Sequence, residues 1–321
     1  GIFVIQFASP VKVIMEEAFY ENENILDVTL PHGLETIEQQ AFQGSSLSSV
    51  NIPGTVTFIG DDLFYKCQNL KYLTFEPSPT KTPLQVETAL FFNGYNVRPD
   101  LTRLEVNRDF VPMSSILSYS GADEIIIGEQ LSEIYDSMFS NSDITSLEIP
   151  IHITKIGSSA FSYNSNLTKL KIHKDVASIG VNAFSGCSKL ADLTIEDSDA
   201  ALSIGIKDYG EEFGPFYDSP LQSIYLGRNI EYLNEHEPDE DDEGVFAVDS
   251  KLNATTTVTI GSKVTKLSDH MFADCPIETL TIPGNVNTIG PDAFAGCEKL
   301  KTVRFEPSKE NIPIVLQNDE T

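Results

Sequence analysis

Residues 158–172 read SSAFSYNSNLTKLKI, and this stretch holds one copy of a pattern that recurs along almost the whole chain. An alanine stands directly before an aromatic residue, Phe161. Six residues later begins an apolar series of Leu167, Leu170 and Ile172. The last four residues of the series alternate between polar and apolar, which is the period of a half-buried β-strand. The stretch therefore predicts a tight turn around a buried aromatic ring, followed by a short strand.

The pattern returns at a nearly constant interval. Phe139 and Phe161 are 22 residues apart, and Phe161 and Phe184 are 23 residues apart. A fixed period of this length indicates a solenoid of stacked repeats. The aromatic position is occupied in turn by Phe19, Phe42, Phe64, Phe92, Leu117, Phe139, Phe161, Phe184, Phe216, Phe246, Phe272 and Phe294. We therefore predict a single solenoid of about 12 repeats over residues 1–321, with loop insertions near 76–100, 197–217 and 234–245.

Each repeat carries one strand after its aromatic residue and a shorter apolar pair after that strand. In the quoted repeat the pair is Val176 and Ile179, and Gly180 follows where we expect the chain to turn. The Ala-Phe segment is too short for an independent helix and is expected to form one helical or 3₁₀ turn. Neighbouring repeats would pair their strands in parallel, about 4.8 Å apart. The predicted strands are Phe3–Phe7, Ile25–Leu30, Leu47–Ile52, Leu70–Phe75, Leu101–Val106, Ala122–Ile127, Ile144–Ile149, Leu167–Ile172, Leu190–Ile195, Leu221–Leu226, Thr255–Ile260, Ile277–Ile282 and Leu300–Phe305.

The repeat resembles the BspA-like class of leucine-rich repeats. The resemblance rests on the segments IGSSAFSYNSNLTKLKI at 156–172, IGVNAFSGCSKLADLTI at 179–195 and IGPDAFAGCEKLKTVRF at 289–305. It implies an α/β fold, a right-handed, curved leucine-rich-repeat solenoid with a parallel β-sheet on one face and short strands, turns and single helical turns on the other. It also implies a secreted or surface-anchored bacterial protein that adheres or captures a ligand and has no catalytic activity. The family has no fixed functional residues to transfer.

The charge of the chain limits its partners. The formal net charge is -27, which argues against a general nucleic-acid binder, because such proteins need a large basic surface. No window of about 18 apolar residues is present, so no direct membrane insertion is expected in this segment. We expect an extracellular or cell-surface location, with the signal or anchor outside this segment.

Residues that could carry chemistry are few and scattered. No two histidines have the spacing of a zinc hydrolase, and no nucleophile motif is present, so we expect no catalytic site, no metal site and no cofactor. The four cysteines each follow an aromatic residue by three positions and are expected to be free, buried thiols; a disulfide between Cys275 and Cys297 is the alternative. The acidic segment 234–244 is interpreted as a solvated loop, with a Ca²⁺ site as the alternative.

The outward-facing strand residues are the best candidates for binding. Opposite charges on neighbouring strands, such as Arg103 beside Glu124, stabilise a parallel sheet and need no ligand. The functional alternative is a concave recognition surface, because solenoids bind through such surfaces. Its predicted residues are Tyr72, Arg103, Glu105, Glu124, Glu148, Lys169, Lys171 and Tyr225. The inserted loops at 76–100 and 197–217 are the rival location. The expected partner is a host or microbial protein, or alternatively a glycan.

Overall fold

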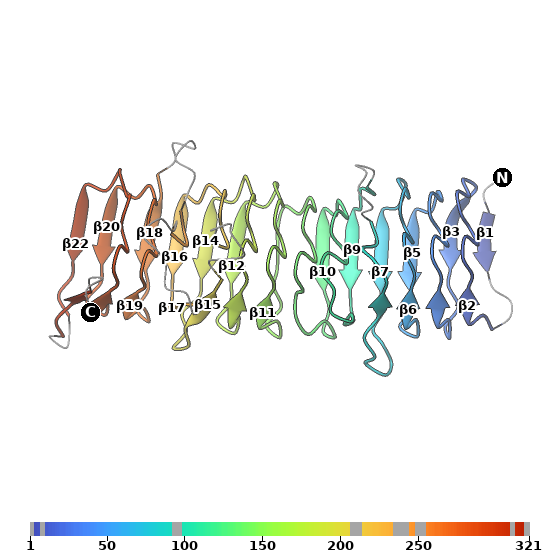
Figure 1. The fold of residues 1–321 in the computed structure, drawn as a ribbon, viewed down its shortest axis with the longest axis horizontal. Helices are drawn as coiled ribbons and strands as arrows, with labels where there is room; N and C mark the ends of the chain where they lie inside the picture. The colour runs from blue at the N-terminus through green and yellow to red at the C-terminus, as the bar shows by residue number, and fades with distance from the viewer. Residues whose placement is uncertain are drawn as a thin grey trace. The chain divides into compact units, whose positions relative to one another are not determined.

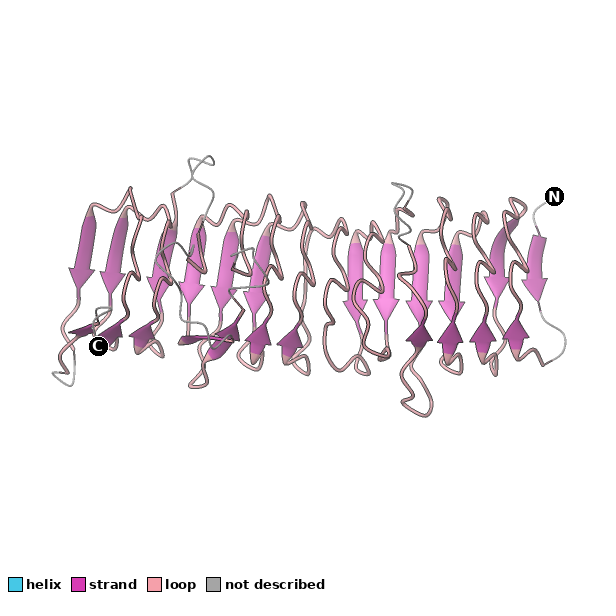
Figure 2. Cartoon of the chain, in the orientation of Figure 1, coloured by secondary structure: helices cyan, strands magenta, loops and turns pink. Residues whose placement is uncertain are grey.

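The computed structural model describes residues 3–6, 10–91, 98–205, 214–233, 244–247, 255–308 and 312–317. The chain divides into two compact units, Gly1–Ile153 and Thr154–Thr321, and each is described by itself. One continuous solenoid over residues 1–321 therefore stays a prediction. Figures 1 and 2 show that each unit consists of stacked strands joined by turns, and no residue is helical in the ranges described.

The first unit contains two parallel sheets. The longer strands form one sheet and the shorter strands form the other, and each of these strands pairs with its counterpart in a neighbouring repeat. The longer strands are β1 (Phe3–Gln6), β3 (Ile25–Thr29), β5 (Ser49–Ile52), β7 (Tyr72–Phe75), β9 (Arg103–Val106) and β10 (Glu124–Ile127). The shorter strands are β2 (Val13–Ile14), β4 (Thr36–Ile37), β6 (Phe58–Ile59) and β8 (Gln85–Val86).

The second unit repeats this arrangement. Its longer strands are β12 (Lys169–Ile172), β14 (Asp192–Ile195), β16 (Ser223–Leu226) and β18 (Thr257–Ile260), followed by the pair β20 (Thr279–Ile282) and β22 (Thr302–Phe305). Its shorter strands are β11 (Lys155–Ile156), β13 (Ser178–Ile179), β15 (Leu202–Ile204) and β17 (Ile230–Tyr232), then β19 (Lys266–Leu267), β21 (Thr288–Ile289) and β23 (Val315–Leu316). Pairs of long strands are in exact register, residue for residue, from β12 through β18.

The predicted alternation sets the faces of the long strands. In β12, Leu170 and Ile172 are buried and Lys169 and Lys171 are exposed. The prediction is wrong at Ile144–Ile149, where the backbone forms no strand although Ile144 and Ile149 are buried. The apolar spacing therefore predicted correctly which residues of this repeat are buried, but it did not predict whether they form a paired strand.

Stacked phenyl rings form a second buried wall in each unit. Phe161 stacks on Phe184 at 5.3 Å between ring centroids, and Phe184 stacks on Phe216 at 5.8 Å. In the first unit Phe64 stacks on Phe91 at 6.4 Å. Phe91 thus occupies the stacked position that the sequence prediction assigned to Phe92, a residue that lies outside the described ranges. The inserted loop before it shifts the spacing on which the prediction relied.

The turns around these rings are not helical, and their backbone shows why. Ser159 lies two residues before Phe161 and Tyr163 lies two residues after it. They have left-handed φ angles of 53° and 59°, respectively. A left-handed residue cannot continue a right-handed helical run. Alternate N–H groups instead reach the next repeat: those of Ser159, Phe161 and Tyr163 donate to the carbonyls of Val181, Ala183 and Ser185 at 2.7–2.8 Å.

This turn ladder, defined by the N–H groups at the aromatic residue and two positions either side of it, recurs in both units. Glu17, Phe19 and Glu21 donate to Gln39, Ala41 and Gln43. His270, Phe272 and Asp274 donate to Pro291, Ala293 and Ala295. The turns thus carry a third set of hydrogen bonds between repeats, beside the two sheets.

The glycine that follows short strands such as β6 and β13 has a different role from the predicted one. Gly180 has no left-handed φ angle, but a Cβ atom there would lie 2.5 Å from the backbone nitrogen of Ser158 in the preceding repeat. Gly60 meets Gln39 N at the same distance. Close approach between repeats, and not the direction of the turn, therefore requires glycine here.

The cysteines satisfy buried carbonyl groups. The Sγ atoms of Cys67, Cys187 and Cys297 lie 3.0, 3.4 and 3.0 Å from the carbonyl oxygen of the aromatic residue one repeat earlier. Ser219 makes the same contact with Phe184 O at 2.9 Å. The prediction of free thiols is confirmed, although Cys297 is only half-buried. Burial raises the pKa of the Cys187 thiol to about 12, so the protonated donor predominates at neutral pH.

Replacing Cys187 separates the donor from the packing. We expect Cys187→Val to lower the free energy of unfolding by only about 0.5–1 kcal/mol, because the carbonyl of Phe161 loses the thiol donor but keeps the hydrogen bond from Asn164 Nδ2 at 2.8 Å. Cys187→Ser, which keeps a donor, should lose less. Urea denaturation of both variants checks this order, and a Val variant as stable as the wild type would show that the contact contributes nothing.

Candidate functional site

The strand face of the first unit brings four of the predicted residues together. Tyr72 on β7 is in register with Arg103 on β9, and Arg103 is in register with Glu124 on β10. Glu105 lies two residues beyond Arg103 on the same face. In a parallel sheet such partners are neighbours about 4.8 Å apart. The row Tyr72, Arg103 and Glu124 therefore forms a continuous surface across three strands.

The charges in this row are largely paired. Arg103 Nη2 lies 3.2 Å from Glu105 Oε2, and Arg103 Nε lies 3.8 Å from Glu124 Oε2. Asn107 Nδ2 donates to the other carboxylate oxygen of Glu105 at 2.9 Å. Tyr72 differs from them, since 52% of it is exposed and its hydroxyl makes no hydrogen bond in the part of the chain that the structure describes. Its ring is the accessible apolar surface of the row.

A polar groove extends this row toward the N-terminal strands. Asp27 on β3 pairs in register with Ser49 on β5, and Ser49 pairs with Tyr72. The groove has a volume of about 370 Å³ and is lined by Asp27, Thr29, His32, Ser49, Asn51 and Glu76, among others. We call this surface the strand-face groove. It offers hydroxyl, amide and carboxylate groups beside an exposed aromatic ring.

Sequence reasoning missed the groove residues, although a signal for them was present. Asp27 and Thr29 occupy the outward positions of Ile25–Leu30, and Ser49 and Asn51 those of Leu47–Ile52. The alternation that selected Tyr72 would have selected them too. The predicted set of surface residues began at Tyr72 on β7 and therefore left out β3 and β5.

The basic residues of the second unit are engaged by carboxylates. Lys169 Nζ lies 3.0 Å from Asp192 Oδ2, and Lys171 Nζ lies 2.5 Å from Glu196 Oε1. The hydrogen bond from Lys171 lowers the pKa of Glu196. The predicted basic spot is thus balanced by acidic neighbours within the same sheet, which weakens it as a binding feature.

Tyr225 and Glu148 complete the predicted set. Tyr225 lies in register with Thr194, itself the partner of Lys171, but its hydroxyl donates to Asp197 Oδ1 at 2.9 Å. That hydrogen bond raises the pKa of Tyr225. Glu148 is exposed and belongs to the first unit, so its predicted pairing with Lys171 stays a prediction.

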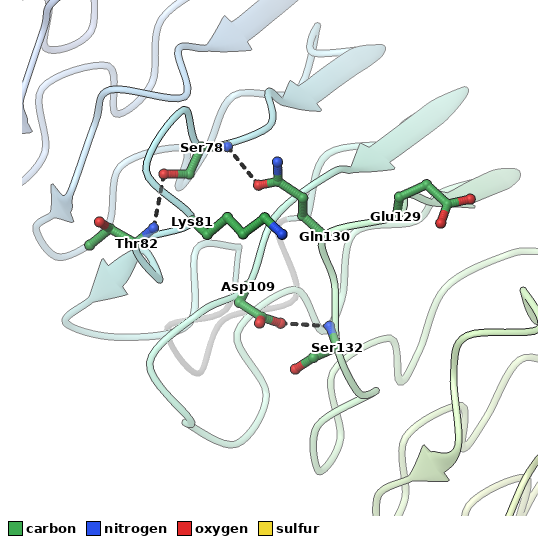
Figure 3. Close-up of a pocket in the computed structure, with 7 residues that line it drawn as sticks. All are labelled: Ser78, Lys81, Thr82, Asp109, Glu129, Gln130 and Ser132. Atoms are coloured by element: carbon green, nitrogen blue, oxygen red, sulfur yellow. Dashed lines mark hydrogen bonds between the residues drawn. The ribbon is translucent and has the colours of Figure 1, made fainter.

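A second cavity lies where the inserted loop after β7 meets the segments after β9 and β10. It has a volume of about 160 Å³, and Figure 3 shows the side chains that surround it. Ser78 N donates to Gln130 Oε1 at 3.0 Å, and Ser132 N donates to Asp109 Oδ1 at 2.7 Å. We call it the loop pocket. It lies in the rival location, the insertion at 76–100, and three separate repeats contribute to it.

A buried arginine supports the loop from below. Arg108 is fully buried, and its Nη2 donates to Thr82 O at 3.0 Å while its Nη1 lies 3.5 Å from Pro53 O. Burial lowers the pKa of its guanidinium to about 10, which leaves it charged at neutral pH. In the second unit Arg228 similarly donates to the carbonyls of Lys174 and His173 at 3.0 and 3.1 Å.

Sequence reasoning missed both arginines. Leu104, Val106 and Arg108 continue one alternating series, which places the arginine on the buried side. The strand period therefore indicated that Arg108 is buried. The prediction did not include it, because a charged side chain is normally expected on the exposed side. An arginine on the apolar phase of a strand pattern is the signal to look for.

The remaining polar residues show no assembled chemical centre in the ranges described. No group of three or more His, Cys, Asp or Glu is placed there to hold a metal ion. His152 Nδ1 lies 3.7 Å from Glu129 Oε2, and His173 Nδ1 accepts a hydrogen bond from Asp175 N. The acidic segment 234–244, proposed as an alternative Ca²⁺ site, lies outside the described residues except for Gly244. None of the described segments forms a helix that could cross a membrane.

Comparison with known proteins identifies similar sequences and folds. The model of the "BspA type Leucine rich repeat region (6 copies)" matches residues 2–94, 114–205 and 243–314. A leucine-rich repeat protein of known structure from Bacteroides ovatus is 18% identical, with 98% of this chain and 74% of that chain covered and a TM-score of 0.51. At this identity the likeness supports the stacked-repeat fold alone. No curated protein matches the chain.

Two more distant structures are similar over most of their lengths. The pneumococcal vaccine antigen PcpA is 19% identical, with 96% of this chain and 77% of that chain covered and a TM-score of 0.44. A leucine rich cell surface protein from Faecalibacterium prausnitzii is 21% identical, with 88% of each chain covered and a TM-score of 0.34. Scores this low carry no argument about this chain.

Proposed function

Because the chain belongs to the family of BspA-type leucine-rich repeat regions, we propose that it is a non-enzymatic binding protein of the bacterial cell surface. The proposed binding surface is the strand-face groove with the exposed Tyr72 at its edge. Repeat proteins bind through broad sheet surfaces of this kind. We further infer that the stack in each unit is right-handed and curved, with the long strands on the concave side, because parallel crossover connections are right-handed.

The single observation that carries the proposal is the position of Tyr72. A large aromatic side chain on a sheet surface normally packs against a neighbour or forms a hydrogen bond. About half of the Tyr72 side chain is instead exposed to solvent. It stands next to a groove of about 370 Å³ whose walls carry many hydrogen-bonding groups. Exposed aromatic residues are enriched where proteins bind their partners.

The chemistry of the groove favours a carbohydrate over a protein as the captured ligand. Asp27, Ser49 and Asn51 supply closely spaced donors and acceptors, which suit a ligand rich in hydroxyl groups. The Tyr72 ring adds a flat apolar surface on which a sugar ring can stack. A protein ligand, with adhesion as the outcome, is the competing proposal and needs no such density of polar groups.

Replacing the ring tests this proposal. We expect Tyr72→Ala to weaken binding of the best glycan on an array roughly tenfold, which corresponds to about 1.4 kcal/mol, because the stacking surface is removed. Tyr72→Phe keeps the ring and should retain most of the affinity.

The control is Tyr163→Ala, which removes an equally exposed tyrosine from a turn of the second unit. Equal glycan binding by wild type and Tyr72→Ala would refute the stacking role. If no glycan binds and a captured protein is lost with Tyr72→Ala, the surface is correct and the ligand class is wrong.

A further inference from the structure

The loop pocket contains two opposite charges that face one small space without pairing. Lys81 extends toward Gln130, and the carboxylate of Asp109 lies on the other side of the same space (Figure 3). The Lys81 ammonium group makes no hydrogen bond or ion pair with any residue that the structure describes, although the backbone N–H of Lys81 donates to Ser78 O at 3.2 Å. An ammonium and a carboxylate that line the same cavity can each bind a ligand group of the opposite charge.

The frame of the pocket holds its polar groups in defined orientations. Gln130 Oε1 accepts the hydrogen bond from Ser78 N, which fixes the side-chain amide, and in Figure 3 its Nε2 group points away from Lys81 and Asp109. Asp109 Oδ1 accepts hydrogen bonds from Ser132 N and from the Tyr135 hydroxyl at 3.3 Å. The second oxygen of Asp109 has no partner among the described residues.

The pocket therefore offers a cationic donor on one side and an anionic acceptor on the other. A simple anion would meet Asp109 on a protein with a net charge of -27, and a metal cation would meet Lys81. Glu129 alters this balance little, because its carboxylate is 92% exposed, lies near His152 and points away from the other labelled side chains in Figure 3. A ligand with one charge of each sign fits both sides.

We propose that the loop pocket binds a small zwitterion of the α-amino acid class. The ligand carboxylate is held by Lys81 Nζ, and the ligand ammonium group is held by the free oxygen of Asp109. A volume of about 160 Å³ holds about five water molecules at about 30 Å³ each, which limits the ligand to a small side chain. This site is separate from the strand-face groove and does not depend on it.

The construction of the pocket explains its place in the chain. The insertion after β7 brings Lys81 over the sheet edge, and the left-handed φ angle of 55° at Lys81 turns the loop there. Arg108 ties the loop to the core through Thr82 O. The segments after β9 and β10 then supply Asp109 and Gln130. The cation thus comes from an element that the regular repeat lacks.

The test titrates L-alanine into the full chain and follows binding by NMR. Two probes of similar size separate the charges: lactate replaces the ammonium group with a hydroxyl, and alaninamide removes the carboxylate charge. We expect saturable binding of L-alanine with a shift of the Gln130 side-chain amide resonances, and at least tenfold weaker binding of both other probes. Equal binding of all three, or no saturable binding of L-alanine, glycine or L-serine, would overturn the proposal.

Matched variants locate the site. Lys81→Met and Asp109→Asn should each weaken L-alanine binding at least tenfold, and Asp109→Asn keeps an oxygen for the hydrogen bond from Ser132 N. Lys266→Met, which removes an exposed lysine from β19, should bind like the wild type. Thermal unfolding of each variant confirms that it is folded. Unchanged affinity in a folded Lys81→Met variant contradicts the assignment.

Discussion

Phe184→Ala is expected to lower the free energy of unfolding by about 4 kcal/mol. The ring is fully buried and stacks on Phe161 and Phe216 with interplanar angles of 7° and 13°. Its removal leaves a cavity that the flanking backbones cannot close, because the turn ladder fixes the spacing of the repeats. Two aromatic contacts, each worth about 1 kcal/mol beyond burial, are lost as well.

Urea denaturation followed by circular dichroism measures this loss, and Phe184→Leu is the graded comparison. Leucine fills part of the cavity, as Leu117 does at the same position of another repeat, where it is also fully buried. We expect it to lose less than half as much stability as alanine. A Phe184→Ala variant within about 1 kcal/mol of the wild type would mean that the repeats relax around the gap, contrary to the ladder argument.

Arg108→Ala is the second large effect, with an expected loss of about 3 kcal/mol. The substitution removes a long, fully buried side chain and leaves the carbonyl of Thr82 without its donor. The hydrogen bond to Thr82 O is only part-buried, so its loss accounts for about 1 kcal/mol, and the cavity left by the buried side chain accounts for the rest. The loop that carries Lys81 is the part of the fold most directly affected.

Arg108→Met distinguishes the two contributions, because methionine fills much of the volume but donates no hydrogen bond. We expect the methionine variant to regain the stability that the alanine variant loses through its cavity, but not the stability that depends on the hydrogen bond. Arg304→Ala, at an exposed position of β22, should change stability by less than about 0.5 kcal/mol. If Met at position 108 is as stable as the wild type, the buried guanidinium only fills space.

The repeat period predicted the main features of the fold because packing imposes it directly. Every position of the strand pattern repeats its environment, so the buried residues of β12 and its neighbours followed from the alternation, and the resemblance to BspA-like repeats is confirmed. The turns did not follow in the same way. Ser159 and Tyr163 are unremarkable residue types, and their left-handed angles arise from hydrogen bonds to the next repeat that no local pattern records.

The candidate sites were predictable to different degrees. Tyr72, Arg103 and Glu124 came together as the strand register required. The loop pocket could not be foreseen, because Lys81 and Asp109 are brought together by an insertion whose path depends on a buried arginine. Sequence spacing predicts the structure of the regular repeat well. It does not predict where an inserted loop packs against the neighbouring repeats.

The turn ladder gives each unit a chemical direction. In the described turns that form the ladder, the N–H groups point toward the following repeat and the carbonyl groups that accept from them point toward the preceding one. The hydrogen bonds at the junction of two repeats are therefore the same whatever the outward-facing residues of those repeats. A repeat in the opposite orientation would place donors against donors. An array built this way can lengthen or shorten by in-frame duplication or loss of whole repeats, since the new junction reproduces the old donors and acceptors. Binding surfaces can then diverge while the scaffold's length evolves separately.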